Sequence, residues 1–377
     1  MDRIHIRNFR NFEDETVELP REGAALIGPN GQGKTNFLEA IYYLEIFRSF
    51  RGARDEQLVS FGADFFRVEG HLTGGVRDEA VEVAAGYVRD GRRKKVTVNG
   101  GGSSAMAENI GRVGAIIFTA SDVDMIAGAP GVRRRFLDII LSLVEPGYLT
   151  TLQRYRQILT QRNELLRARG DATALAAWND GLVLEGSRIL CARSRWVARA
   201  KREFAKYYET FSGGQRAAME YCPSVSSLRS EGEVEPGEDE WADAFRQQLT
   251  SSVERELRRG MTLLGPHRDD LRFGIASGAA DVNLRIFGSA GQQRTAAIAL
   301  RMVEADTLRN ARGRRPIVML DDVFAALAPE RSRRVIEMLS DLEWGQVIVT
   351  SPKPDEYALL GGRLREYRIE QGRIDSA

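Results

Sequence analysis

The sequence predicts an α/β nucleotide-binding fold that is interrupted by an inserted helical lobe. Residues 28–35 fit the phosphate-loop pattern G-x-x-x-x-G-K-[ST], and residues 317–322 read as an apolar strand that ends in two aspartates. About 290 positions separate these segments, too many for one simple phosphate-loop domain. We therefore expect a discontinuous lobe I of residues 1–118 and 262–377, and a helical lobe II of residues 119–261.

The phosphate loop predicts the ligand class, a nucleoside triphosphate with Mg²⁺. Its residues are Gly28, Pro29, Asn30, Gly31, Gln32, Gly33, Lys34 and Thr35. Glycines let successive N–H groups point at the phosphates, Lys34 supplies a positive charge, and the Thr35 hydroxyl is offered to Mg²⁺. A short apolar strand precedes the loop and a helical pattern over residues 36–44 follows it. The alternative is a chance match in a chain with 37 glycines.

The other elements of lobe I follow from alternation, turn residues and apolar runs. We expect an edge strand from Ile4 that Val17 and Leu19 continue, and a basic loop over residues 48–51. Further strands are predicted at residues 24–27, 65–72, 81–88, 94–98, 282–286, 316–320 and 346–350, with a helix at 291–309.

Lobe II is predicted to be helical because apolar residues recur at steps of three and four. The predicted helices are residues 132–144, 148–169, 172–208 and 241–259. The acidic run over residues 230–240 is expected to be a solvated loop. No internal repeat and no long heptad stretch is visible in the sequence.

Composition and net charge limit the classes of protein to which this chain can belong. The 377 residues are 43% hydrophobic and 28% charged, which is ordinary for a globular protein. No apolar run could span a bilayer, and the first residues lack a secretory signal, so we expect a cytoplasmic location. The two cysteines are expected to be free thiols, and the three histidines are too scattered for a zinc site. A net charge of +1 does not itself call for nucleic acid.

The two aspartates that end the apolar strand are candidates for the chemistry. Asp321 would hold Mg²⁺, directly or through water, and Asp322 would act as general base on the attacking water. The alternative is a strand-ending turn with two solvated acids.

A second candidate anion site lies at the start of the helix predicted from Gly291. Ser289 and Gly291 would aim at phosphate oxygens. In isolation, Ser289 reads better as an ordinary N-cap residue. The order along the chain favours the functional interpretation: phosphate loop, long insertion, S-x-G-Q-Q, helix, acidic strand.

This order is the layout of ABC-type ATPases, and the chain closely resembles the RecF family of SMC-like ATPases over nearly its whole length. The motifs that carry the resemblance are N-F-R-N-F at residues 8–12, the phosphate loop with residues 36–41, R-R-R-F-L-D at 133–138, Q-R-N at 161–163, G-P-H-R-D-D at 265–270, G-Q-Q-R-T at 291–295 and L-D-D-V-F at 320–324.

The resemblance implies an ABC/SMC-type head in which two ATP molecules lie between two copies of the chain. Ser289 and Gly291 would contact the γ-phosphate bound to the other copy, so ATP would drive homodimerisation and hydrolysis would reverse it. The match also assigns Arg10, Asn11, Asn36 and Gln292 to the nucleotide site, beside Lys34. The family acts in recombinational repair, replication and the SOS response, binds DNA, and helps RecO and RecR load RecA at gaps.

The chain departs from the family pattern in several places. Residues 325–328 read A-A-L-A where the family usually has S-E-L-D, so Ala328 replaces an interface aspartate. The candidate base is an aspartate rather than glutamate, no histidine follows Thr350, and no Q-loop glutamine can be placed. These features favour slow hydrolysis and a switch-like role. A transporter-type ATPase subunit and an SMC-like structural head are the competing functions, and the latter would need long coiled-coil arms.

Arginines in lobe II are the candidates for DNA contact. Arg133, Arg134 and Arg135 are consecutive, and Arg188, Arg195, Arg199 and Arg202 could form one helical stripe. The alternative for each is a solvated helix face. No groove-reading motif is present, so we expect contact with the DNA backbone rather than with sequence.

Overall fold

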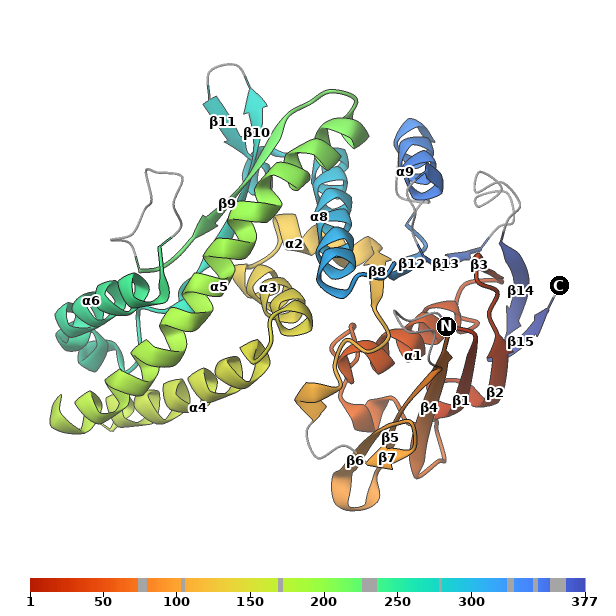
Figure 1. Ribbon diagram of the computed structural model, residues 1–377, viewed down its shortest axis with the longest axis horizontal. Coiled ribbons are helices and arrows are strands. Elements are labelled where there is room, and N and C mark those ends of the chain that lie inside the picture. The colour runs from red at the N-terminus through yellow and green to blue at the C-terminus, as the bar shows by residue number, and fades with distance from the viewer. Residues whose placement is uncertain are drawn as a thin grey trace. The chain divides into compact units, whose positions relative to one another are not determined.

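The computed structural model describes residues 1–73, 80–102, 106–168, 172–225, 236–277, 280–323, 329–341, 345–352 and 364–376. The chain divides into two compact units (Figure 1): unit 1 contains Met1–Asp122 and Leu300–Ala377, and unit 2 contains Val123–Ala299. The second boundary therefore lies later than the predicted limit at 262. The reason is strand pairing, because Asp270–Ser277 pairs with Ala217–Cys222 and joins the helical unit.

Unit 1 is built on two six-stranded sheets. One is antiparallel, with strand order β2-β1-β4-β5-β6-β7. Its strands are β1 (Arg3–Phe9), β2 (Phe12–Glu18), β4 (Phe65–Leu72), β5 (Val81–Val88), β6 (Arg93–Val98) and β7 (Gly101–Gly102). The other has the order β15-β14-β3-β13-β12-β8 and is parallel except at β15. Its strands are β3 (Gly23–Ile27), β8 (Ala115–Thr119), β12 (Ile317–Asp321), β13 (Val347–Ser351), β14 (Arg365–Glu370) and β15 (Arg373–Ser376).

Helix α1 (Lys34–Ile46) packs against both sheets of unit 1, on β1, β4 and β5 of one and on β8 and β12 of the other. A helix covered on two sides needs apolar residues around most of its circumference. Accordingly Phe37, Leu38, Ile41 and Leu44 are fully buried. The core of unit 1 thus holds the helix that follows the phosphate loop in a fixed position.

Unit 2 is organised around one long helix. Helix α5 (Ala172–Ser212) packs against α4 (Tyr148–Arg167), α6 (Glu238–Arg259) and β9 (Ala217–Cys222). Strand β10 (Asp270–Ser277) lies between β9 and β11 (Ala280–Asn283) in a three-stranded antiparallel sheet. The remaining helices are α2 (Asp124–Ala127), α3 (Pro130–Val144) and α7 (Leu284–Phe287); α8 (Ala290–Arg312) contains the boundary between the units, and α9 (Pro329–Asp341) belongs to unit 1.

The predicted strand at residues 282–286 is wrong in its second half. Strand β11 ends at Asn283, and the short helix α7 begins at Leu284. The Asn283 side chain accepts a hydrogen bond of 2.9 Å from the backbone N–H of Arg285, so Asn283 caps the helix. The alternating pattern did not reveal this cap.

Two other expectations need correction. Strand β1 is not an edge strand, because it pairs with β2 on one side and β4 on the other. The acidic run is not entirely loop, since Glu238 begins α6, where acidic residues in the first turn favour the helix dipole. Strands β8, β9, β14 and β15 were not predicted individually.

The predicted free thiols are confirmed, as neither Cys191 nor Cys222 forms a disulfide. None of the helices in the described part of the chain has the length and apolar character needed to cross a lipid bilayer.

Candidate nucleotide-binding site

The phosphate loop and the acidic strand meet at one edge of the parallel sheet of unit 1. Strand β13 lies between β3, which leads into the loop, and β12, which ends in Asp321. The carboxyl ends of parallel strands share one edge, which is where α/β sheets bind their ligands. Thr350 of β13 is in register with Leu26 on one side and with Asp321 on the other. We call the loop and these strand ends the nucleotide edge.

The loop has the conformation that its glycines allow. Gly31 has φ of 84° and Gly33 has φ of 118°, a region that residues with a side chain rarely adopt. A Cβ atom on Gly33 would also lie 2.6 Å from Asn11 Nδ2. Substitution of Gly33 would therefore strain the backbone and clash with a neighbour.

The Lys34 ammonium is bonded to backbone carbonyl groups of the phosphate loop. Its Nζ donates hydrogen bonds to the carbonyl oxygens of Gly28 and Pro29, the latter at 2.9 Å. Partial burial lowers the pKa of Lys34, and the charges of Asp322 and Asp321 act against that shift. Its ammonium is bonded to neutral carbonyls rather than to a carboxylate, so it can attract phosphate oxygens.

Thr35 and Asp321 form a pair suited to a hard cation. The Thr35 hydroxyl lies 2.9 Å from both carboxylate oxygens of Asp321, and the Thr350 hydroxyl donates to Asp321 Oδ1 at 2.9 Å. Burial raises the pKa of Asp321, while hydrogen bonds from Thr350 and Thr35 oppose the rise. Hydroxyl and carboxylate oxygens are the donors that Mg²⁺ prefers, and Mg²⁺ takes its other ligands from phosphates and water. The residues present therefore fit a magnesium–triphosphate complex.

Asp322 follows in an uncommon backbone conformation. Its φ is 51°, and its backbone N–H donates to Thr350 Oγ1 at 3.1 Å. Residues at active sites often hold such a conformation when their surroundings enforce it. Thr350, which sequence reasoning noted only for the missing histidine, thus positions both aspartates. Its place at the end of the strand beside β12 could have indicated this role.

Asn11 and Arg10 connect the first strands to the loop and to α1. Asn11 Nδ2 donates to the carbonyl of Gln32 at 2.9 Å, and Asn36 Nδ2 donates to Asn11 Oδ1 at 2.8 Å. Arg10 has φ of 57° and forms two hydrogen bonds, of 2.8 and 3.1 Å, with the fully buried carboxylate of Glu39. The structure brings these residues to the loop, and their contact with a nucleotide stays a prediction.

Ser289 caps α8, in agreement with the simpler of its two interpretations. Its backbone N–H donates to Gln292 Oε1 at 2.8 Å, and its Oγ accepts from the Gln292 N–H at 3.2 Å. This reciprocal arrangement is a capping box. Ser289 is exposed and Gly291 is half-buried, so a role at another molecule's phosphate is compatible with the cap. Ala328 and its neighbours 325–327 lie outside the described residues.

The consecutive arginines of α3 do not form one exposed patch. Arg133 is 1% exposed and its guanidinium binds the carboxylate of Asp270 at 2.6 and 2.9 Å. Arg134 is half-buried, and only Arg135 is exposed. The prediction is wrong for Arg133 because its charge is already neutralised inside unit 2.

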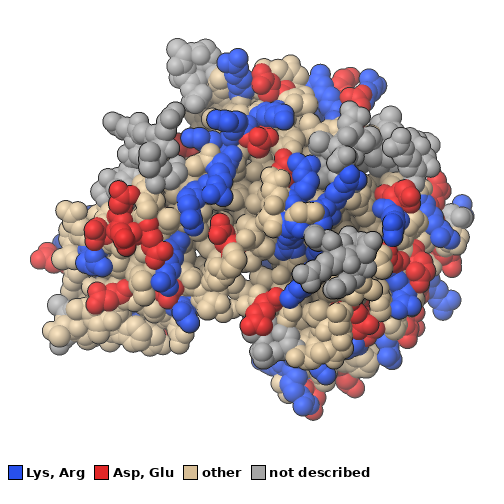
Figure 2. All heavy atoms as spheres, viewed as in Figure 1, with Lys and Arg blue, Asp and Glu red and all other residues tan. Residues whose placement is uncertain are grey.

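The predicted stripe on α5 is exposed, as expected. Arg195, Arg199 and Arg202 are all exposed and make no ion pair with any residue in the described ranges. Figure 2 shows Lys and Arg side chains following the line of α5. Arg188 differs, because it pairs with Glu238 at 3.0 Å.

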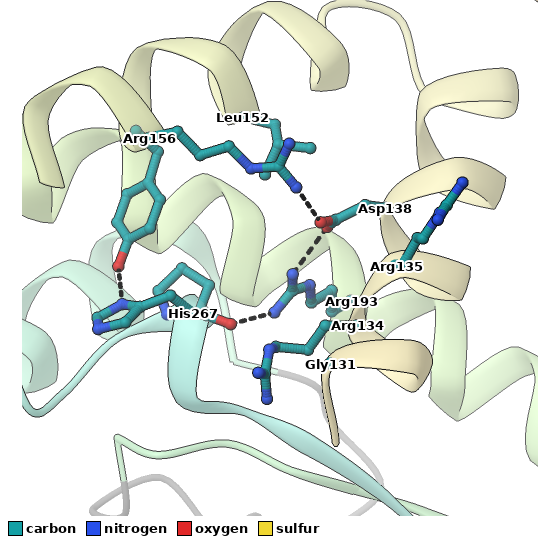
Figure 3. A pocket seen from close by; sticks show the side chains of 10 residues that line it. Gly131, Arg134, Arg135, Asp138, Leu152, Arg156, Arg193 and His267 are labelled. Atoms are coloured by element: carbon teal, nitrogen blue, oxygen red, sulfur yellow. Dashed lines mark hydrogen bonds and ion pairs between the residues drawn. The ribbon is translucent and has the colours of Figure 1, made fainter. Parts of the chain in front are cut away.

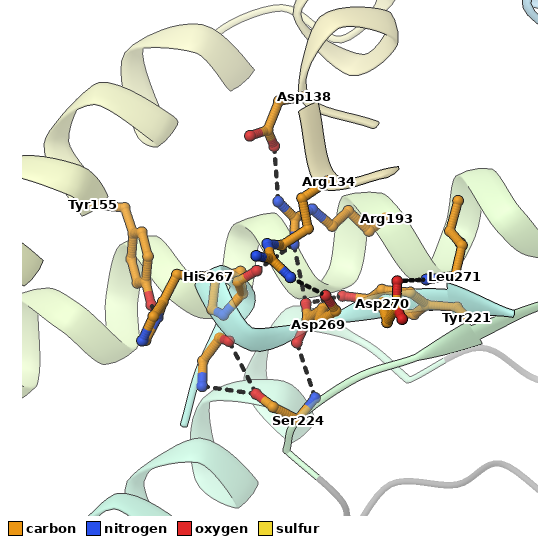
Figure 4. A network of polar contacts seen from close by, with 12 residues as sticks. Arg134, Asp138, Tyr155, Arg193, Tyr221, Ser224, His267, Asp269, Asp270 and Leu271 are labelled. Atoms are coloured by element: carbon orange, nitrogen blue, oxygen red, sulfur yellow. Dashed lines mark hydrogen bonds and ion pairs between the residues drawn. The ribbon is translucent and has the colours of Figure 1, made fainter. Parts of the chain in front are cut away.

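Residues of the G-P-H-R-D-D and Q-R-N motifs form hydrogen bonds and ion pairs in the interior of unit 2. Arg193 of α5, 2% exposed, binds Asp269 Oδ2 at 3.1 Å and Asp138 Oδ1 at 2.8 Å (Figure 4). Its guanidinium also donates to the Pro266 carbonyl at 2.6 Å. Arg162, fully buried, donates to Glu256 at 2.6 Å. We call the cluster around Arg193 the arginine network; its residues are Arg133, Arg134, Asp138, Arg193, Tyr221, Asp269 and Asp270.

Comparison with known proteins agrees with this architecture. Residues 1–361 match the family described as RecF/RecN/SMC N terminal domain. The DNA replication and repair protein RecF of Synechococcus sp. is 34% identical, covering 98% of this chain and 96% of the relative. RecF of Moorella thermoacetica is 36% identical, covering 100% of this chain and 98% of the relative.

Two kinds of solved structure are similar. A structure of the recombination mediator protein RecF with ATP in the RecFOR pathway superposes with a TM-score of 0.88 at 27% identity, covering 100% of this chain and 97% of that one. An Smc head domain of Pyrococcus furiosus gives 0.58 at 15% identity, covering 100% of this chain and 95% of that one, which shows the shared fold alone. The chain belongs to the RecF/RecN/SMC family of ABC-type ATPase heads, and within it to the RecF group.

Proposed function

We propose that this chain is an ATP-switched, DNA-binding protein of recombinational repair. The observation that carries the proposal is the nucleotide edge, where Lys34, Thr35 and Asp321 converge beside Asp322. Its charged groups are held by carbonyls and hydroxyls, so they remain available to a triphosphate. Similarity to a RecF structure with ATP supports ATP as the nucleotide.

Each residue of the edge would have a distinct part in hydrolysis. The loop N–H groups and Lys34 bind the phosphates, and Thr35 and Asp321 would hold Mg²⁺, which neutralises charge on the β- and γ-phosphates. Asp322 would take the proton from the attacking water. Its side chain is one methylene shorter than the glutamate usual in ABC ATPases, which favours slow turnover. ATP would then act as a switch.

The surroundings of Ser289 support a homodimer as the ATP-bound state. Ile286 and Phe287, three and two residues before Ser289, are 68% and 71% exposed. Apolar side chains exposed next to a predicted γ-phosphate contact are typical of a protein interface. We infer that Ser289, Gly291 and Gln292 contact ATP held by the second copy, and that hydrolysis separates the copies.

DNA would bind along α5. Steps of four and three residues place Arg195, Arg199 and Arg202 on one helix face, and each is exposed. Such a stripe suits phosphate contacts, which bind without regard to sequence and weaken with salt. Because relatives carry the RecF name and a similar structure is described within the RecFOR pathway, we propose RecO and RecR as partners and RecA loading at gaps as the outcome.

The decisive experiment is the mass of the protein in solution with and without ATP and Mg²⁺, using Asp322→Asn to slow hydrolysis. We expect a dimer only with both ligands. Lys34→Ala should give a monomer under all conditions, because it removes the charge that binds the phosphates. A dimer of Lys34→Ala that still depends on ATP would overturn the role of the loop.

Ser289→Arg separates the two halves of the proposal. The bulky cation should block the second copy, while ATP binding to the monomer continues at the wild-type affinity. Loss of ATP binding by the monomer would show that Ser289 acts on its own chain's nucleotide, and the two-copy site would be wrong.

A further inference from the structure

Unit 2 contains a cavity of about 240 Å³ that the ATPase cycle does not use. Helices α3, α4 and α5 and the turn at residues 265–268 surround it (Figure 3). Its lining has a cationic part and a less polar part. The cationic part is formed by Arg134, Arg135, Arg156 and Arg193, and the less polar part by Leu152, Tyr155, Pro266 and His267.

The cavity has more positive than negative charge. Asp138 is the one carboxylate among its lining residues, and it accepts from Arg193 at 2.8 Å and from Arg156 at 2.9 Å. Arg193 is balanced further by Asp269 at 3.1 Å. Asp138 and Asp269 are thus already bound to Arg156 and Arg193, and Arg134 forms a direct ion pair with neither of them.

Arg134 is bonded to a backbone carbonyl rather than to a carboxylate. It donates to the backbone carbonyl of Asp269 at 2.7 Å and forms no ion pair with any residue in the described ranges. Burial lowers the pKa of Arg134 and the neighbouring charge of Arg193 lowers it further, while the charges of Asp269, Asp270 and Asp138 act against that shift. A half-buried guanidinium beside another cation gains from a bound anion, especially one that can accept two parallel hydrogen bonds.

His267 adds no charge to the less polar part of the cavity lining. Burial lowers the pKa of His267 to about 4, so the ring is neutral at neutral pH. Its Nε2 lies 3.2 Å from the Thr262 carbonyl, which can only accept, so Nε2 carries the proton. Nδ1 must then accept from the Tyr155 hydroxyl at 2.7 Å. The ring nitrogens are therefore occupied, and recognition falls to the arginines.

We propose that this cavity binds a compact phosphate group, with Arg134 and Arg156 donating to its oxygens. The Asp269 carbonyl holds Arg134, and Asp138 holds Arg156. The volume is below the roughly 300 Å³ at which pockets begin to accept drug-sized ligands, which favours a single phosphate over a nucleotide. The phosphate could belong to the end of a nucleic-acid strand or be free inorganic phosphate.

The test is a calorimetric titration of the full chain with inorganic phosphate. The Lys34→Ala variant serves as the starting protein, because the phosphate loop could itself bind phosphate. We expect one site to remain in Lys34→Ala. Adding Arg134→Gln should weaken its affinity at least about tenfold, the effect of losing one charge-assisted hydrogen bond.

Two further variants make the result decisive. Arg156 is 59% exposed, so Arg156→Gln should fold normally and also weaken phosphate binding. Arg246→Gln is the matched control, since Arg246 is exposed on α6, pairs with Asp243 and does not line the cavity. Loss of all phosphate binding in Lys34→Ala, or unchanged binding in both cavity variants, would overturn the proposal.

A second titration identifies the source of the phosphate. Short oligonucleotides with and without a terminal phosphate are compared on Lys34→Ala and on its Arg134→Gln derivative. A preference for the phosphorylated strand that requires Arg134 assigns the cavity to strand ends, and equal binding assigns it to free phosphate. Neither result depends on ATP or on dimerisation, so the cavity and the proposed switch can fail separately.

Discussion

The nucleotide edge of unit 1 and the arginine network of unit 2 both gather acids and cations, but they satisfy these charges in different ways. In the network, Arg193 binds two carboxylates and is buried at 2% exposure. At the edge, Lys34 donates to carbonyl oxygens, and Asp321 accepts from the hydroxyls of Thr35 and Thr350. Buried charges that bind each other depend on both partners being present, and charges held by neutral groups remain available to a ligand.

The largest effect is expected from breaking the arginine network. Arg193→Gln would leave Asp138 and Asp269 buried without their cation, and removing one partner of a buried ion pair costs about 3–5 kcal/mol. Urea unfolding, followed by tryptophan fluorescence, measures the loss. Arg199→Gln, at an exposed position of α5, should change stability by no more than about 0.5 kcal/mol. A loss for Arg193→Gln as small as that of the control would mean that the network does not stabilise unit 2.

His267 gives an intermediate effect that depends on pH. Its pKa falls from an ordinary 6.5 to about 4 on folding because the ring is buried. Between these values the unfolded chain binds more protons, so stability is complete above pH 6.5 and is lost as pH falls toward 4. The loss should reach about 3 kcal/mol at most.

His267→Gln isolates this contribution, because the charged neighbours Arg134, Arg193, Arg268 and Asp269 are unchanged. Burial raises the pKa of Asp269, which acts in the opposite direction and is common to both proteins. The difference in unfolding free energy between wild type and variant, measured across the acid range, should shrink as the pH falls. A constant difference would exclude a neutral buried His267.

The smallest effect is expected from a substitution of Thr350 in the nucleotide edge. Thr350→Val removes a hydroxyl that bonds Asp321 at 2.9 Å and accepts from the Asp322 N–H at 3.1 Å. We expect a stability cost of about 1 kcal/mol in thermal unfolding and a severalfold weaker affinity for ATP with Mg²⁺. Thr350→Ser keeps the hydroxyl and should restore both. If the serine variant is as impaired as the valine variant, packing rather than hydrogen bonding positions the aspartates.

Sequence reasoning was most successful where a motif combines with strong periodicity. The strands at residues 65–72 and 81–88 were predicted with the bounds that the structure has. Burial alternates strictly along β4, whereas β5 has three consecutive buried residues, Val83, Ala84 and Ala85. The loop, Thr35 and Asp321 were predicted together because the loop motif and an apolar strand that ends in aspartates occur in one chain.

Long-range partners were not predictable in the same way. The sequence does not show that Arg133 finds Asp270, or that Thr350 lies between two aspartates and the loop strand. A row of three arginines looks like a surface feature until the fold brings a carboxylate to it. The cap at Asn283 was missed because one hydrogen bond decided between strand and helix.

The strand order of the parallel sheet has a consequence for how the protein is made. Among the described residues of this sheet, β3 pairs with β13 and β14, and β8 pairs with β12. The partners of β3 and β8 begin at Ile317, after every residue of unit 2. During synthesis all residues of unit 2 are therefore made before unit 1 is complete. The parallel sheet that carries the phosphate loop can form only after strands made nearly 300 residues later. The proposed nucleotide edge is therefore among the last parts of the molecule that synthesis can complete.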